Sequence, residues 1–88
     1  MGEFTPPHGA ALVSTLRKRS VLLAGHATSV ALEPEFWAVL DEIAAHDGLT
    51  GAALLARIDA ERGRRPLASA CRVTALAWRS RNSVPSPD

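Results

Sequence analysis

The sequence has a single cysteine, Cys71, and no metal-binding side chains at a recognisable spacing. One cysteine excludes a disulfide within the chain and is typical of a reducing compartment. The three histidines, at positions 8, 26 and 46, are far apart, and neither C-x2-C nor H-x3-H occurs. The sequence therefore predicts no metal site and no cofactor. No catalytic set of side chains stands out, so we expect a protein that is not an enzyme.

Long apolar runs and large side chains are also scarce. No stretch approaches the roughly 18 residues of a membrane span, and the N-terminal basic cluster follows its apolar stretch, which is the wrong order for a signal peptide. We therefore expect no membrane association and a cytoplasmic location of bacterial type. The 88 residues are 47% hydrophobic but contain only two Trp and two Phe, so we expect a small core shared between two copies of the chain.

A strand followed by two helices is predicted in the middle of the chain. Val30 and Leu32 alternate with small or polar residues, which indicates a half-buried strand, and Pro34 ends it and begins a helix. Apolar residues at helical spacing form the buried face of this helix, namely Phe36, Trp37, Leu40, Ile43 and Ala44. Gly48 ends the helix in a left-handed conformation, and Thr50 caps the next one. The apolar face of that second helix consists of Leu54, Leu55 and Ile58.

The predicted strand has no second strand downstream with which to pair. Unpaired backbone N–H and C=O groups are costly when they are buried. We therefore expect the same strand of a second copy to be its partner, which makes the protein a homodimer. Upstream, residues 19–32 form either one long bent strand or two strands with Gly25 as a hinge or bulge, and we favour the bent strand.

A third helix is predicted from about Leu67 to Arg79, and Val73 and Leu76 widen its apolar stripe. The stripe itself consists of Leu67, Ala70, Cys71, Thr74, Ala77 and Trp78. It is wide enough to cap the dimer or to bind a protein partner through residues 67–79. Residues 1–17 are predicted to be a flexible arm, and residues 82–88, rich in Pro and Ser, a disordered tail.

Acidic and basic residues are segregated along the chain, although the net charge is only +1. Residues 33–47 hold five acidic residues and no Lys or Arg, whereas residues 57–81 hold seven Arg against Asp59 and Glu61. This pattern indicates either one basic and one acidic face or an ordinary solvated surface with charge pairs.

Four segments of the chain carry a resemblance to a known family: KRSVLLAGHATSVALEPEFW, LDEIAAHDGL, LLARIDAERG and LASACRVTALAWR. Together they resemble the ribbon-helix-helix family and, more closely, a bacterial subgroup of short members. The similarity covers a domain of roughly residues 18–81. The pairs Gly25-His26 and Thr28-Ser29 and the segment from Glu33 to Trp37 are its most specific parts.

The resemblance implies a mainly α fold with one short strand, an intertwined dimer with an antiparallel β-ribbon between the subunits, and an extra C-terminal helix. The ribbon of such a protein enters the major groove of double-stranded DNA, and the protein regulates transcription. In this chain, Thr28, Val30 and Leu32 would point into the core. The residues implied to contact DNA are Lys18, Arg19, Ala27, Ser29, Ala31, Thr50 and Gly51.

These residues have different implied roles. Ser29 lies at a base-facing position, and so do Ala27, where the subgroup commonly has Arg, and Ala31. The start of the second helix, at Thr50 and Gly51, offers free N–H groups to a phosphate. Lys18 and Arg19 also grip phosphates in this interpretation, as do Arg64 and Arg65. Alanine cannot make a bidentate base contact, so an alternative stays open: a ribbon-helix-helix module that binds proteins and has weak or lost DNA binding.

Overall fold

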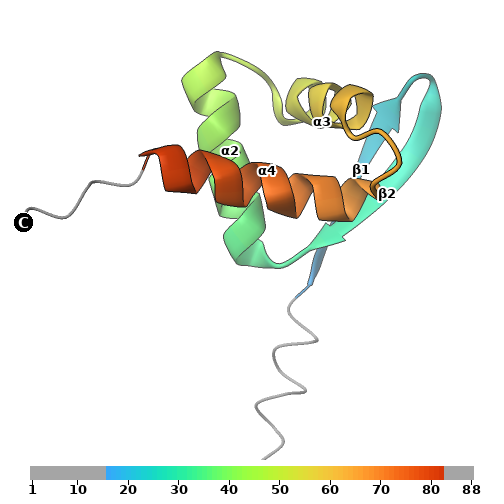
Figure 1. Cartoon of the computed structure of the whole chain (residues 1–88). Coiled ribbons are helices and arrows are strands. Elements are labelled where there is room, and N and C mark those ends of the chain that lie inside the picture. Colours follow the sequence, from blue (N-terminus) through green and yellow to red (C-terminus); the bar gives the residue numbers. More distant parts are fainter. Residues whose placement is uncertain (1–15, 83–88) are drawn as a thin grey trace, which may run out of the picture.

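The computed structural model describes residues 16–82 of the chain. Two strands and three helices follow one another in this part (Figure 1). They are β1 (Arg17–Leu23), β2 (His26–Leu32), α2 (Pro34–Asp47), α3 (Gly51–Glu61) and α4 (Leu67–Asn82). The predicted arm and tail fall mostly outside the described residues, although Arg17 belongs to β1 and Asn82 to α4.

The two strands form an antiparallel hairpin within one chain. Ala24 (φ 51°) and Gly25 (φ 82°) join them, and two positive φ angles are what a tight type I′ turn requires. The pairing runs from Leu23 opposite His26 to Arg17 opposite Leu32. The predictions of a single short strand and of a continuous bent path over residues 19–32 are therefore wrong. The second strand lies upstream of the predicted one. The turn was not recognised because Ala24 occupies a left-handed position, and L-residues other than glycine seldom adopt positive φ.

The ends of the helices are set by local signals in the sequence. Pro34 occupies the first turn of α2. Gly48 ends that helix with φ 67°, and its backbone N–H donates to the carbonyl oxygens of the last turn. The Thr50 hydroxyl accepts a hydrogen bond from the Ala53 N–H at 3.0 Å and so caps α3. These boundaries confirm the prediction of a Pro-started helix, a Gly break and a Thr-capped helix.

The core lies where the ribbon and the three helices meet. Among the described residues it contains Leu23, Val30, Leu32, Trp37, Leu40, Ile43, Ala44, Leu54, Leu55, Ile58, Ala70, Cys71 and Ala75. The buried face of α4 differs from the prediction, because Ala75 is buried whereas Ala77 is exposed. Val73 and Leu76, which were expected to widen the buried stripe, are 43% and 61% exposed on the outer side of α4. The inner face of α4 thus closes the core of its own chain.

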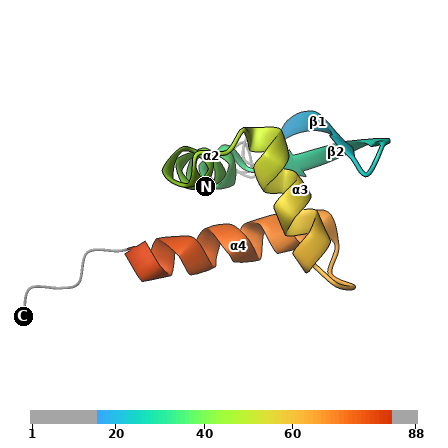
Figure 2. The ribbon, with the colours of Figure 1, turned by 90° about the horizontal axis from the view of Figure 1, so that it is seen from above.

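The ribbon and α4 lie on opposite sides of the molecule, and α3 runs between them (Figure 2). This arrangement separates two surfaces, one on the ribbon and one on the outer side of α4. No helix in the described part of the chain is long and apolar enough to cross a membrane.

Candidate functional site

The ribbon has an inner face that packs on the helices and an outer face that is open to solvent. Val30 and Leu32 of β2 are buried, whereas Ala27 and Ser29 are exposed and Ala31 is half-buried, which confirms the predicted alternation. Because directly paired residues project to the same side of a sheet, the register extends this outer face onto β1. We define the outer ribbon face as Lys18, Ser20, Leu22, Ala27, Ser29 and Ala31.

Three cross-strand pairs make up the outer ribbon face. Lys18 lies opposite Ala31, Ser20 opposite Ser29, and Leu22 opposite Ala27. The hydroxyl oxygens of Ser20 and Ser29 are 3.5 Å apart, and Leu22 is 69% exposed at the turn end. Ser20 and Leu22 were missing from the predicted site because β1 was not assigned as a separate strand. Its alternation, with Val21 and Leu23 pointing inward, was the available signal.

The ribbon carries positive charge and no negative charge. Residues 17–32 contain Arg17, Lys18 and Arg19 but no Asp or Glu. Lys18 is exposed on the outer ribbon face, and no ion pair joins it to another residue within 16–82. Within the described part of the chain, an anion approaching this face therefore meets an ammonium group that has no ion-pair partner, and meets no carboxylate.

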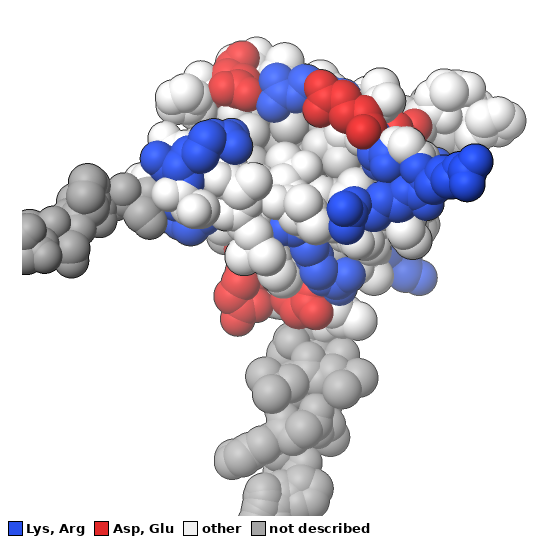
Figure 3. All heavy atoms as spheres, viewed as in Figure 1, with Lys and Arg blue, Asp and Glu red and all other residues white. Residues whose placement is uncertain are grey.

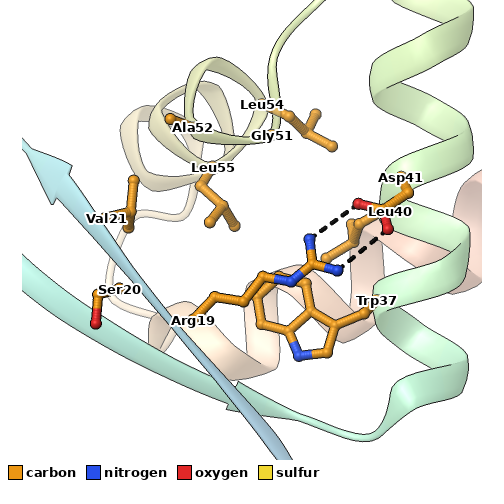
Figure 4. Close-up of a pocket in the computed structure, with 10 residues that line it drawn as sticks. All are labelled: Arg19, Ser20, Val21, Trp37, Leu40, Asp41, Gly51, Ala52, Leu54 and Leu55. Atoms are coloured by element: carbon orange, nitrogen blue, oxygen red, sulfur yellow. Dashed lines mark hydrogen bonds and ion pairs between the residues drawn. The ribbon is translucent and has the colours of Figure 1, made fainter.

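Arg19 points to the other side and fastens β1 to α2 (Figure 4). Its guanidinium donates to both carboxylate oxygens of Asp41, at 2.9 and 3.1 Å, and lies 4.3 Å from the ring centroid of Trp37. The hydrogen bond from Arg19 holds the pKa of Asp41 below its ordinary value. The indole N–H of Trp37 in turn donates to the carbonyl oxygen of Arg17 at 2.8 Å. We call this set of contacts the Arg19 brace.

A cavity of about 190 Å³ lies beside the brace, between β1, α2 and the start of α3. Its apolar walls include Val21, Leu40 and Leu55, and Gly51 lies at its edge (Figure 4). The first turn of α3 is therefore next to β1. The N–H groups of the first helical residues have no partner within a helix, and the Thr50 hydroxyl takes only that of Ala53. The structure thus brings this end of α3 close to the ribbon.

Most of the charge segregation seen in the sequence is neutralised in space. Four carboxylates of residues 33–47 pair with arginines of other elements, in the pairs Arg19–Asp41, Arg57–Asp47, Arg72–Glu33 and Arg79–Glu42. Figure 3 shows the face that α4 covers, with cations at both ends, acidic groups beside further cations along its upper and lower edges, and uncharged atoms in the middle. Arg64 and Arg65 lie exposed on the connector before α4, and neither forms an ion pair with another residue of the described part.

The side chains that would favour enzymatic or metal chemistry are dispersed. No group of three His, Cys, Asp or Glu residues within 16–82 is arranged to hold a metal ion. The Nδ1 atom of His46 lies at hydrogen-bond distance (3.0 Å) from the Asp47 carboxylate, and the ring meets Trp78 edge-on at 6.1 Å. Cys71 is fully buried, and burial raises the pKa of its thiol to about 11. Such a thiol is a packing group and a poor nucleophile.

Two comparisons with known proteins agree with this geometry. The family model of the ribbon-helix-helix domain matches residues 16–79. Among solved structures, the chain is similar to an uncharacterized protein from Bordetella pertussis Tohama I, with 35% sequence identity and a TM-score of 0.70. The similarity covers 88% of this chain and 68% of that one. A search of curated proteins found no match.

Proposed function

This chain belongs to the ribbon-helix-helix family, whose members are generally DNA-binding regulators, and on that basis we propose that it is a cytoplasmic, homodimeric regulator of bacterial transcription that binds double-stranded DNA. The observation that carries the proposal is the outer ribbon face, which is exposed and free of acidic residues.

The dimensions of the ribbon fit the major groove. Seven residues in each strand correspond to about 23 Å, and the groove, about 12 Å wide, admits a two-stranded ribbon. In this position Lys18 reaches a phosphate, and the hydroxyl groups of Ser20 and Ser29 face base edges. Ala27 and Ala31 lie against the bases without hydrogen-bonding to them.

The start of α3 and the connector before α4 supply further phosphate contacts. The free N–H groups at Gly51, positioned by the Thr50 cap, suit a phosphate oxygen because the positive end of the helix dipole lies there. Arg64 and Arg65 add two cations that are not engaged by carboxylates of the described residues. These contacts fix the position of the protein on DNA, and sequence discrimination is left to the ribbon.

The homodimer in this proposal is supported by the edges of the ribbon. Within residues 16–82, no backbone–backbone hydrogen bond joins β1 or β2 to any other element, although the Arg17 carbonyl oxygen accepts from the Trp37 indole. Open strand edges are templates for pairing with another chain. A second copy therefore has a surface on which to dock, even though each chain completes a ribbon by itself. Sedimentation equilibrium at low micromolar concentration should show a dimer, and a folded monomer under these conditions would exclude this part of the proposal.

DNA binding is tested by fluorescence anisotropy with a short duplex of mixed sequence over a series of salt concentrations. We expect binding that weakens as salt rises, with a log–log slope of about −0.9 for each phosphate contact. Lys18→Gln should make the slope shallower by about 0.9 per subunit, whereas Arg81→Gln, at the far end of α4, should leave it unchanged. Absence of binding at low salt by an intact, folded protein would refute the proposal.

A second candidate function is a protein-binding module with weak or lost DNA binding, and the outer side of α4 favours it. Val73 and Leu76 are exposed there. A partner that binds through residues 67–79 must use this outer side, because the inner side is buried in the core. A folded dimer that fails to bind DNA would make this function the better one, and Leu76→Asp would then disrupt partner binding.

A further inference from the structure

The outer ribbon face has an unusual composition for a surface that reads DNA. Three of its six side chains, Leu22, Ala27 and Ala31, are hydrocarbon, and Leu22 is 69% exposed. The hydrogen-bonding groups are the two central serines, and Lys18 lies at the other end from the turn. Apart from Lys18, the face has none of the side chains that make the usual bidentate or accepting contacts to guanine, adenine and cytosine, because it lacks Arg, Asn, Gln, Asp and Glu.

The hydrocarbon side chains are concentrated at the turn end of the face. Leu22 and Ala27 are directly paired there, so their side chains lie side by side. Between them they present a continuous apolar surface at the end of a ribbon that carries three cations and no acidic residue. The positive charge of the ribbon favours binding to the DNA phosphates, and the apolar turn end of the outer ribbon face is suited to contact an apolar group of the DNA.

The major groove offers one hydrocarbon group at the edge of its bases, the C5-methyl group of thymine. We propose that Leu22 and Ala27 read thymine methyl groups, and that the methyl group, more than a hydrogen-bonding pattern, determines which DNA this protein prefers. The inference rests on the proposed function and names the chemical group of the DNA that the protein recognises. The hydroxyl groups of Ser20 and Ser29 then contact the neighbouring base edges, since a hydroxyl can donate to or accept from any base.

The spacing of the ribbon predicts where the methyl groups lie. Outward side chains on one strand are about 6.8 Å apart, which is about two base pairs at roughly 3.4 Å per step. Ala31, two outward positions along β2 from Ala27, therefore lies about four base pairs from it. A second methyl group at this distance would contact the Ala31 side chain, which lies next to the phosphate that Lys18 neutralises.

Replacing thymine by uracil tests the inference, because uracil lacks only the methyl group and keeps the charge and hydrogen-bonding edges of the duplex. The probes are an alternating A·T duplex and the same duplex with deoxyuridine at every thymidine. Burial of one methyl group changes affinity about fourfold, so loss of two contacts should weaken binding about tenfold or more. The salt slope should stay the same, because the phosphate contacts are unchanged.

A matched pair of leucine variants locates the contact. Leu22→Ser should reduce the preference for thymine over uracil by about fourfold. Leu76→Ser, which alters a leucine of similar exposure on the outer side of α4, should leave the preference unchanged. As an independent probe, alternating G·C duplex with 5-methylcytosine should bind more tightly than its unmethylated form. Circular dichroism and sedimentation establish that each variant is folded and has the wild-type oligomeric state.

Several results would overturn the inference. Equal affinity for the thymine and uracil duplexes would show that methyl groups are not read, while binding to both would leave the proposed function standing. Equal effects of the two leucine variants would exclude a specific role for Leu22. Conversion of the dimer to a monomer by Leu22→Ser would place that side chain against a second copy. Failure to bind any duplex would refute the proposed function itself.

Discussion

The Arg19 brace yields a prediction that separates a structural cation from a DNA-binding one. Lys18 and Arg19 are neighbours on β1, yet Lys18 lies on the outer ribbon face and Arg19 contacts Asp41 and Trp37 on α2. Removing either charge, in Lys18→Gln or Arg19→Gln, changes the net charge equally. The two variants should nevertheless affect different properties, stability for Arg19→Gln and DNA binding for Lys18→Gln, because their side chains project to opposite faces of the same strand.

The size of the effect of Arg19→Gln follows from the exposure of the brace. The side chains of Arg19 and Asp41 are 44% and 55% exposed, so solvent screens their attraction, and pairs of this kind contribute about 0.2–1 kcal/mol. The bidentate geometry favours the upper part of this range, and an exposed cation–π contact with Trp37 adds about 0.5 kcal/mol. We therefore expect Arg19→Gln to lower the free energy of unfolding by about 1 kcal/mol, which corresponds to about 4–8 °C in Tm for a domain of this size.

The assay measures thermal unfolding and the salt dependence of DNA binding for both variants. Arg19→Gln should lower Tm and leave the log–log slope unchanged, whereas Lys18→Gln should leave the free energy of unfolding within about 0.5 kcal/mol of wild type and reduce the slope by about 0.9 per subunit. A slope change in Arg19→Gln as large as that in Lys18→Gln, with Tm unaffected, would refute the brace and return Arg19 to the phosphate contacts.

Three further predictions concern the core, the ribbon and pH. Trp37→Ala should destabilise the protein by about 3–5 kcal/mol in urea unfolding, because Trp37 is 4% exposed and also donates to the Arg17 carbonyl; a loss under about 0.5 kcal/mol, typical of a surface position, would contradict its burial. Ala27→Arg should raise DNA affinity at low salt and steepen the slope by about 1–2 units in a dimer, with Tm almost unchanged; an unchanged slope would remove Ala27 from the DNA interface. Acid should weaken the fold, because the folded structure lowers the pKa values of three carboxyl groups, those of Glu33, Asp41 and Asp47. The ordinary pKa is 4.5 for Glu33 and 3.8 for Asp41 and Asp47. The folded state then binds fewer protons than the unfolded chain, so their contribution is complete above about pH 4.5 and is lost as pH falls through the lowered pKa values; equal urea midpoints at neutral and strongly acidic pH would refute this.

The helices of this fold could be predicted because their signals are local. Pro34, Gly48 and Thr50 each restrict the backbone or satisfy an end group by their own chemistry, without reference to distant residues. The alternation of β2 was equally predictable, since Val30 and Leu32 define a parity that assigns Ala27 and Ser29 to the outer face.

The hairpin and the brace could not be predicted in the same way. Pairing of β1 with β2 depends on a turn in which Ala24 adopts a conformation that its side chain disfavours. The position of the Arg19 side chain depends on Asp41, 22 residues away. In the sequence, Arg19 is one of three consecutive cations, and nothing distinguishes it from Arg17 and Lys18. The first reason explains why Ser20 and Leu22 were absent from the predicted site, and the second explains why the pairing of Arg19 with Asp41 was not predicted.

The hairpin also has a consequence for how a ribbon of the proposed homodimer forms. A two-residue turn joins strands that are adjacent in sequence, and local hairpins of this kind close in about 1–10 μs. Ribbon formation is therefore a unimolecular event that does not slow down when the protein is dilute. In the proposed homodimer, each chain supplies a ribbon paired within itself, so the association of two copies joins preformed surfaces and does not require unfolded strands to intertwine.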